Sequence, residues 1–245
     1  MNDGILITEG MTFSLTQLSI EINKETGEIS FAGGQPMLHY DVCPVWLSIA
    51  IEHLKEAKQA RDDMLAAKDA GNDELVNKSL ERGFRGSMQA VMSSAIAIDA
   101  LYAVVKTKVT PDAKPFDPDK RAPRRFAQVS EQLRQAFQLK PKVFAMLRDA
   151  IEQIFKFRDE AVHPTGNSTQ PVSHPGLNVG VERRLVVFRY ENGLAIVRTA
   201  VGIISELAAK GTTKNAALEQ YARSLKLRLD PIRAEPMLGL PPFEN

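Results

Sequence analysis

One short segment of the chain brings together residue types that can act on a phosphate group. The segment spans residues 157–164, reads FRDEAVHP, and follows a run of apolar residues typical of a buried helix. A guanidinium in such surroundings must be paired or must face a polar cleft, and it suits the charge of a phosphate in a transition state. A histidine can accept or donate a proton near neutral pH. Arg158 and His163 are therefore the candidate catalytic pair.

The position of this pair on a helix restricts how it can work. His163 lies in the last turn before Pro164, where the negative end of the helix dipole favours a protonated imidazole. Residues five positions apart diverge by about 140° on an ideal helix. Arg158 and His163 therefore meet at one phosphate only if Arg158 curls along the surface, if the last turn unwinds, or if a second subunit completes the site.

The order Arg-Asp-x-x-x-His at the end of an apolar helix, directly followed by proline, resembles the Arg-x(4–6)-His motif of the HEPN-domain superfamily. The resemblance covers residues 44–210 in architecture and residues 157–164 in motif. It implies a helical bundle with the motif near the end of a late helix. Many members of that superfamily are metal-independent ribonucleases whose two motifs meet at a dimer interface.

This resemblance implies a function and a role for each residue of the motif. The 2′-OH of an RNA would attack the adjacent phosphate, with His163 as general base or acid and Arg158 holding the phosphate charge. Asp159 would be the polar residue that commonly follows the arginine in active members. The expected protein is an endoribonuclease that acts on RNA as a homodimer. A role as a toxin or defence effector, with an antitoxin or regulatory protein as partner, is one that this activity could serve.

Two other interpretations of the same residues stay open. The chain can be a helical interaction module with a HEPN-like bundle and no catalytic activity. Alternatively, His163 only caps a helix and Arg158 belongs to a structural ion pair. Asp99 lies inside the apolar stretch 96–101, where it can orient Arg158 or His163 from a neighbouring helix or can simply be paired in the core.

A second candidate site is the basic end of a long loop. The loop spans Thr107–Arg125 and contains four prolines, which stiffen it by fixing φ. We expect the loop to lie beside the active cleft, where its closing cations would contact RNA phosphates, although a solvated basic loop is the commoner outcome. These cations are Lys120, Arg121, Arg124 and Arg125.

The helix that carries the motif also predicts an oligomeric state. Phe155 and Phe157 cannot both point easily into one core, so this helix is apolar on more than one face. We therefore expect a homodimer that forms through it.

Composition narrows the remaining possibilities. The net charge of +1 over 245 residues does not indicate whether the protein binds nucleic acid, so any basic binding site must be a local patch. Cys43, the single cysteine, rules out an intrachain disulfide and a cysteine-based zinc site. His39 and His174 lie in predicted loops without companion carboxylates, so we expect neither metal nor cofactor. The sequence shows neither the pattern of a signal peptide nor a run of roughly 18 apolar residues. We therefore expect a cytoplasmic location and no membrane contact.

The pattern of apolar residues predicts a mainly α fold, a HEPN-like four-helix bundle with two peripheral β-hairpins. Residues 1–36 would form an N-terminal hairpin extension, with strands within Thr12–Phe31 and a break at Gly33–Pro36. Residues 37–228 would form the bundle, with a second hairpin inserted near 184–198 around the Asn192-Gly193 turn. Residues 229–245, which are rich in proline, would be an extended tail.

The expected helices have boundaries set by proline, glycine and asparagine. The second helix should be interrupted near Gly83 and Gly86 before it continues to Lys106. The other expected helices span Pro44–Ala70, Phe126–Leu139, Pro141–His163, Ala200–Lys210 and Thr213–Leu227.

Overall fold

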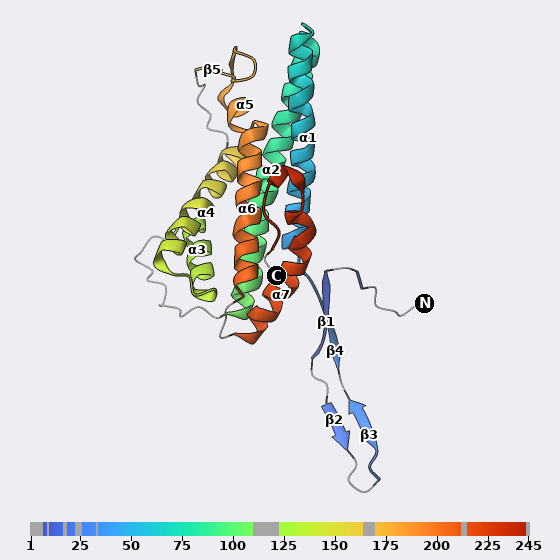
Figure 1. The fold of residues 1–245 in the computed structure, drawn as a ribbon. Coiled ribbons are helices and arrows are strands. Elements are labelled where there is room, and N and C mark those ends of the chain that lie inside the picture. Colours follow the sequence, from blue (N-terminus) through green and yellow to red (C-terminus); the bar gives the residue numbers. More distant parts are fainter. Residues whose placement is uncertain are drawn as a thin grey trace. The chain divides into compact units, whose positions relative to one another are not determined.

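The computed structural model describes residues 7–8, 10–16, 19–22, 26–32, 34–109, 123–163, 170–211 and 215–243. The chain is mainly helical, as predicted, and it divides into two compact units (Figure 1). The first unit is Met1–Val42, and its described residues form strands and the connections between them. The second unit is Cys43–Asn245 and contains every helix found among the described residues.

The N-terminal unit consists of two antiparallel strand pairs. Strand β2 (Ser19–Ile22) pairs with β3 (Ile29–Ala32), which confirms the expected hairpin. The break expected at Gly33–Pro36 does not include its last two residues. These residues begin strand β4 (Gln35–Tyr40), which pairs with β1 (Met11–Thr16).

The first two helices form a long antiparallel pair, α1 (Cys43–Asp69) and α2 (Asp73–Lys108) (Figure 1). Local chemistry sets the turn between them. Gly71 has a φ of +68°, a left-handed conformation that glycine adopts without steric cost. The side chain of Asn72 accepts a hydrogen bond from the backbone N–H of Leu75 and so caps α2. The expected end of the first helix is therefore confirmed.

Helix α2 is continuous, so the predicted interruption near Gly83 and Gly86 is wrong. A Cβ atom added at Gly86 would lie 2.9 Å from the carbonyl oxygen of His53 on α1. Glycine at this position lets the two helix backbones approach each other closely and does not break the helix.

The hairpin predicted near 184–198 is also wrong, because this stretch is helical. It contains α5 (Arg183–Val187) and the start of α6 (Tyr190–Lys210). The Asn192 side chain donates hydrogen bonds to the carbonyls of Val186 and Val187 and so joins the two helices. Gly193 packs against Ser87 of α2, so the Asn-Gly pair serves helix packing here and not a turn. The small strands β5 (Val172–Ser173) and β6 (Gly180–Val181) pair just before α5.

The expected extended tail is wrong as well. Helix α7 (Ala216–Arg233) continues past Asp230 and is followed by a short 3-10 helix, η1 (Pro236–Leu238). Leu238 is buried, and the guanidinium of Arg233 donates hydrogen bonds to the carbonyl oxygen of Pro241. The end of the described chain is thus part of the packed unit.

The helices pack as a bundle in which α2 contacts α1, α6, α4 (Pro141–Val162) and α3 (Arg125–Ala136). The largest fully buried side chains include Leu54 of α1, Ile98 of α2, Ile151 of α4 and Ile204 of α6. The bounds of α3 and α4 lie within three residues of those expected.

Helices α2 and α6 are each long and apolar enough to cross a membrane by length and composition alone, although no such run was expected from the sequence. Half of the apolar window in each helix is buried inside the structure. A core helix meets the same criterion, because it too is apolar around much of its circumference.

Candidate active site at the end of helix α4

Helix α4 places the candidate motif at its C-terminal end. Pro141 occupies the first turn, where its missing N–H costs no hydrogen bond. Leu147, Ile151 and Ile154 are buried on the face toward the bundle. The helix ends at Val162, and the backbone N–H of His163 donates a hydrogen bond to the carbonyl oxygen of Asp159 at 2.8 Å. The helix end is therefore the one that the sequence predicts, to within one residue.

Arg158 is fixed by three neighbours. Its Nε and Nη2 atoms donate hydrogen bonds to Oδ1 of Asp159, at 3.0 Å and 2.7 Å. Its Nη1 atom lies 3.5 Å from Oδ2 of Asp99 on helix α2. The guanidinium carbon also lies 4.3 Å from the centre of the Phe155 ring, within range of a cation–π interaction. Only 23% of the Arg158 side chain is exposed, so the guanidinium has little freedom to move.

Asp99 joins three helices at this point. Its Oδ1 atom accepts a hydrogen bond from Nε of Arg125, the first residue of α3, at 2.9 Å. Its Oδ2 atom faces Arg158 of α4. The Arg125 guanidinium also lies 4.4 Å above the Tyr102 ring. The Asp99 carboxylate thus lies between two guanidinium groups, and Asp99 and Asp159 together balance the charges of Arg125 and Arg158.

His163 stands apart from this cluster. Its side chain is exposed, and within the described part of the chain no hydrogen bond or ion pair involves its imidazole. The structure therefore brings Arg158, Asp159, Asp99 and Arg125 together but does not place the His163 imidazole in contact with Arg158. Residues 164–169, which follow His163, are outside the described residues.

The predicted basic loop is only partly described. Lys120 and Arg121 lie outside the described residues. Arg124 is exposed and immediately precedes α3, while Arg125 is the first residue of that helix and pairs with Asp99. The end of the loop therefore reaches the Arg158 cluster, but Arg125 is held by a carboxylate and an aromatic ring.

Phe155 and Phe157 do not require a second subunit, contrary to the expectation from the sequence. Phe155 is only 2% exposed, and the Phe157 ring packs edge-on against Phe188 with 6.3 Å between ring centres. Both rings are accommodated in one chain, because Phe188 at the end of α5 covers the second face of α4. Val143 and Met146, in the first half of α4, remain exposed.

Sequence reasoning missed one further feature, a cavity bounded by α1, α2 and residues 174–191. Neither Arg158 nor His163 lines it. Its lining residues are far apart in the sequence, so no local pattern marks them. No group of three or more His, Cys, Asp and Glu side chains in the described ranges is arranged to hold a metal ion.

Comparison with known proteins gives no match: no family model matches the chain, and neither a curated protein nor a solved structure shows significant similarity to it.

Proposed function

We propose that the chain is an endoribonuclease of HEPN type that cleaves RNA without a metal ion. One observation carries the proposal: a carboxylate from another helix anchors Arg158 at the end of α4, five residues before an exposed histidine. A guanidinium held in place in this way loses little entropy when it binds a phosphate. An exposed histidine can reach the proton of a 2′-OH or the leaving 5′ oxygen.

The proposed reaction is a transfer of the phosphate within the RNA. The 2′ oxygen forms a bond to the adjacent phosphorus as the bond from phosphorus to the 5′ oxygen breaks. One histidine accepts the 2′-OH proton, and the departing 5′ oxygen receives a proton from a second imidazole or from water. Arg158 stabilises the additional negative charge on the phosphate oxygens. The products are a 2′,3′-cyclic phosphate and a 5′-hydroxyl.

A homodimer forms part of this proposal. The His163 imidazole does not contact Arg158 of its own chain, so a second copy that supplies its own motif fits a composite site. The exposed Val143 and Met146 of α4 provide apolar surface for such a contact.

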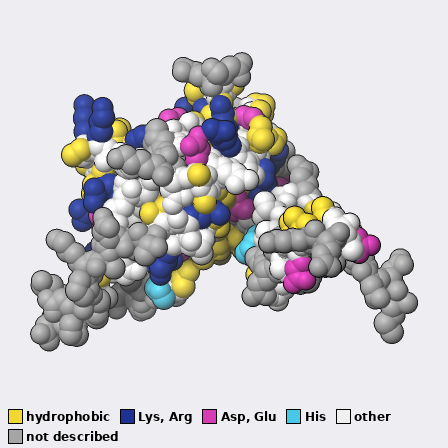
Figure 2. Space-filling view, turned by 90° about the horizontal axis from the view of Figure 1, so that it is seen from below, with side chains coloured by type: hydrophobic (Ala, Val, Ile, Leu, Met, Phe, Trp, Pro, Cys, Tyr) yellow, Lys and Arg dark blue, Asp and Glu magenta, His cyan; other side chains and the backbone are white. Residues whose placement is uncertain are grey.

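The charge of the helical unit supports an RNA substrate. Residues 1–42 contain six Asp and Glu but only one basic residue, Lys24. Residues 43–245 therefore contain thirty Lys and Arg against twenty-four Asp and Glu, which is a formal charge of +6 that the whole-chain value conceals. Figure 2, a view of one face, shows described Lys and Arg side chains in several separate groups. A cytoplasmic location, a role in toxicity or defence, and an antitoxin or regulatory partner belong to the same proposal.

The test is RNA cleavage by purified variants in EDTA. We expect wild type to cleave mixed RNA and His163→Ala to be at least about 100-fold slower, because proton transfer by a positioned histidine contributes a factor of this order. Arg158→Ala should lose a similar amount. His53→Ala is the matched control, since it removes a partly exposed histidine from α1 and should retain wild-type activity. Equal rates for wild type and His163→Ala would refute the catalytic pair.

A non-catalytic helical interaction module is the second candidate. It is favoured by the fact that Nε, Nη1 and Nη2 of Arg158 all face carboxylates, as expected of a structural ion-pair cluster. In that case no RNA is cleaved by wild type, while Arg158→Ala still lowers the free energy of unfolding because Asp99 loses a partner. The cleavage assay therefore separates the two candidates.

A further inference from the structure

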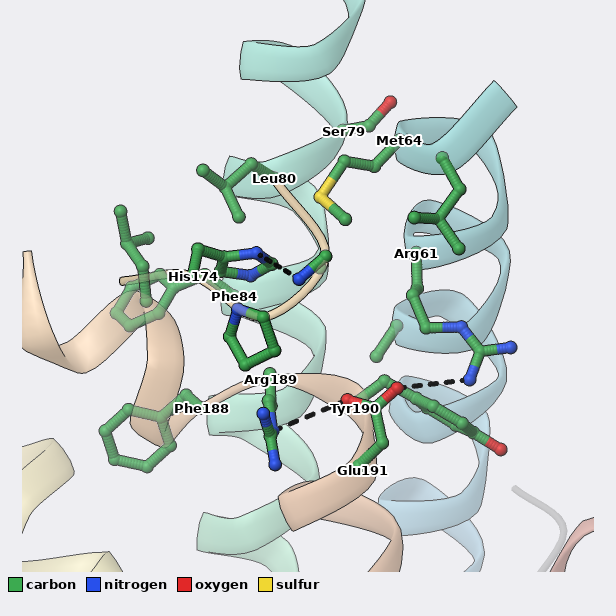
Figure 3. Close-up of a pocket in the computed structure, with 16 residues that line it drawn as sticks. Arg61, Met64, Ser79, Leu80, Phe84, His174, Phe188, Arg189, Tyr190 and Glu191 are labelled. Carbon is green, nitrogen blue, oxygen red and sulfur yellow. Dashed lines mark hydrogen bonds and ion pairs between the residues drawn. The ribbon is translucent and has the colours of Figure 1, made fainter. Parts of the chain in front are cut away.

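The cavity between α1, α2 and residues 174–191 has a volume of about 360 Å³ (Figure 3). This volume lies near the lower end of the range for small-molecule sites, roughly 300–1,000 Å³. Most of its wall is apolar and comes from both helices and from α5. The apolar side chains that line it include Met64, Leu65, Leu80, Phe84, Leu185 and Phe188.

One side of the cavity is polar and carries an excess of positive charge. Glu191 accepts a hydrogen bond from Nη1 of Arg61 at 3.2 Å, and its other oxygen lies 3.6 Å from Nε of Arg189. Arg61 also pairs with Asp62 at 2.7 Å, and Asp62 in turn pairs with Lys58 at 2.9 Å. Among the side chains that line the cavity, Arg61 and Arg189 are cationic and Glu191 is anionic, so the lining has a formal charge of +1. Nε of Arg189 is buried and has no hydrogen-bond partner among the described residues.

A buried histidine provides a hydrogen-bond donor in the same wall. His174 is only 5% exposed, and its Nδ1 atom accepts a hydrogen bond from the backbone N–H of Gly176 at 3.2 Å. Burial, followed by the charge of Arg189, lowers the pKa of His174, so the ring is neutral at pH 7. Because Nδ1 is an acceptor, the proton must be on Nε2, for which the described part of the chain offers no acceptor.

The loop that carries His174 is attached to α1 on the opposite side of the cavity. Nζ of Lys68 donates a hydrogen bond to the carbonyl oxygen of Gly176 at 2.8 Å. Figure 3 shows Met64 extending from α1 toward His174, while the Arg61 guanidinium lies beside Glu191 and Tyr190. The cavity is therefore bounded by fixed groups, which reduces the entropic cost of binding a ligand.

We propose that this cavity binds a small amphipathic carboxylate, whose carboxylate group accepts hydrogen bonds from Nε2 of His174 and from Arg189 while its apolar body contacts Met64, Leu65 and Phe84. The ligand carboxylate provides an acceptor for Nε2 of His174 and a second anionic partner for the Arg189 guanidinium, whose Nε faces Glu191 at 3.6 Å, and it balances the excess positive charge of the lining. This site is separate from the Arg158 cluster, and the inference holds whether or not the chain cleaves RNA.

Calorimetric titration of the full chain with octanoate and with octanamide tests this inference. The two probes share an alkyl chain and differ in charge. We expect octanoate to bind with a Kd of about 1 mM or tighter, which is what about ten heavy atoms can provide. Octanamide should bind about tenfold more weakly, because a hydrogen bond to a charged group exceeds one to a neutral group by about this factor.

Two variants of the cavity wall and one control variant test whether the preference for octanoate arises at this site. Arg189→Met should abolish the preference for octanoate over octanamide while preserving the apolar contacts. Arg184→Met is the matched control, because Arg184 pairs with Glu182 and does not line the cavity, so its preference should stay as in wild type. His174→Phe, which keeps a ring but removes the donor, gives a second variant should Arg189→Met fail to fold. Failure of octanoate to bind wild type, equal binding of the two probes, or an unchanged preference in Arg189→Met would overturn the proposal.

Discussion

At the scale of single residues, the two groups of the candidate active site are held in opposite ways. Arg158 is fixed by Asp159 and by Asp99, while His163 caps its helix only through its backbone and leaves its imidazole exposed. A phosphate site needs a fixed cation, whereas a proton-transfer group needs access to solvent and substrate. The sequence could indicate that Arg158 and Asp99 lie on adjacent helices, because both interrupt apolar stretches. The start of α3 could be predicted to within one residue, but the contact of Arg125 with Asp99 could not, because it depends on how α3 packs against α2.

The buried His174 leads to a prediction about stability and pH. Burial and the charges of Arg189 and Lys68 lower its pKa, and Glu191 opposes them. The unfolded chain, with the ordinary value of 6.5, then takes up a proton at a higher pH than the folded chain. The free energy of unfolding should therefore be fully retained above pH 6.5 and should fall as pH decreases below it, by at most about 1.4 kcal/mol per pH unit for this group.

Urea unfolding at pH 7.5 and pH 5.5 measures this effect. His174→Gln should lose less stability than wild type between these two pH values, since glutamine does not titrate. The exposed His39 provides the control, and His39→Gln should behave like wild type. An equal loss in wild type and in His174→Gln would show that the histidine does not contribute.

At the scale of the elements, the helix ends could be predicted and the assignment of residues 184–198 could not. Pro141, Gly71 and Asn72 fix helix ends through local chemistry, so their effect is visible in the sequence. The alternation around Val187 and the Asn192-Gly193 pair suit a hairpin equally well. The helix prevails because residues at helical spacing, such as Val197 and Val201, are buried against the bundle, and that stabilisation comes from distant parts of the chain.

The close approach of α1 and α2 predicts opposite effects for two glycine substitutions. Gly86→Ala should lower the free energy of unfolding by about 1–3 kcal/mol, because its Cβ would lie 2.9 Å from the His53 carbonyl oxygen and 3.1 Å from the Ala57 nitrogen. Gly83→Ala should instead raise it by about 0.5–1 kcal/mol, since its Cβ would meet Ala60 at an ordinary 3.6 Å and alanine favours a helix. Chemical denaturation measures both, and equal shifts in the two variants would contradict this account of the packing.

At the scale of the whole molecule, the division of charge and the division into two units coincide. The N-terminal unit is acidic and exposes apolar side chains such as Ile20, Ile22 and Ile29, while the basic helical unit has a continuous core. Overall composition gave no indication of nucleic-acid binding because these opposite charges cancel. The candidate RNA site and the cavity both lie in the basic unit.

The proposed dimer predicts that a charge introduced on the exposed apolar surface of α4 will separate the two copies. Met146 is 67% exposed on α4, and Met146→Glu should convert the dimer to a monomer because an ionised carboxylate would be buried at the interface. Leu227→Glu on α7 is the control, since Leu227 is similarly exposed at 71% but lies outside α4. Light scattering at micromolar concentration distinguishes the two states. A monomeric wild type, or a dimer that survives Met146→Glu, would exclude an interface centred on this residue.

The most direct test of the central claim is the chemistry of the RNA ends that the protein produces. Wild type would be incubated in EDTA with an RNA oligonucleotide and, separately, with the same oligonucleotide methylated at every 2′ oxygen. Attack by the 2′ oxygen predicts products with a 2′,3′-cyclic phosphate and a 5′-hydroxyl, no cleavage of the methylated strand, and loss of these products in His163→Ala. Cleavage of the methylated strand, products with a 3′-hydroxyl, or the same products from His163→Ala would contradict the proposed function.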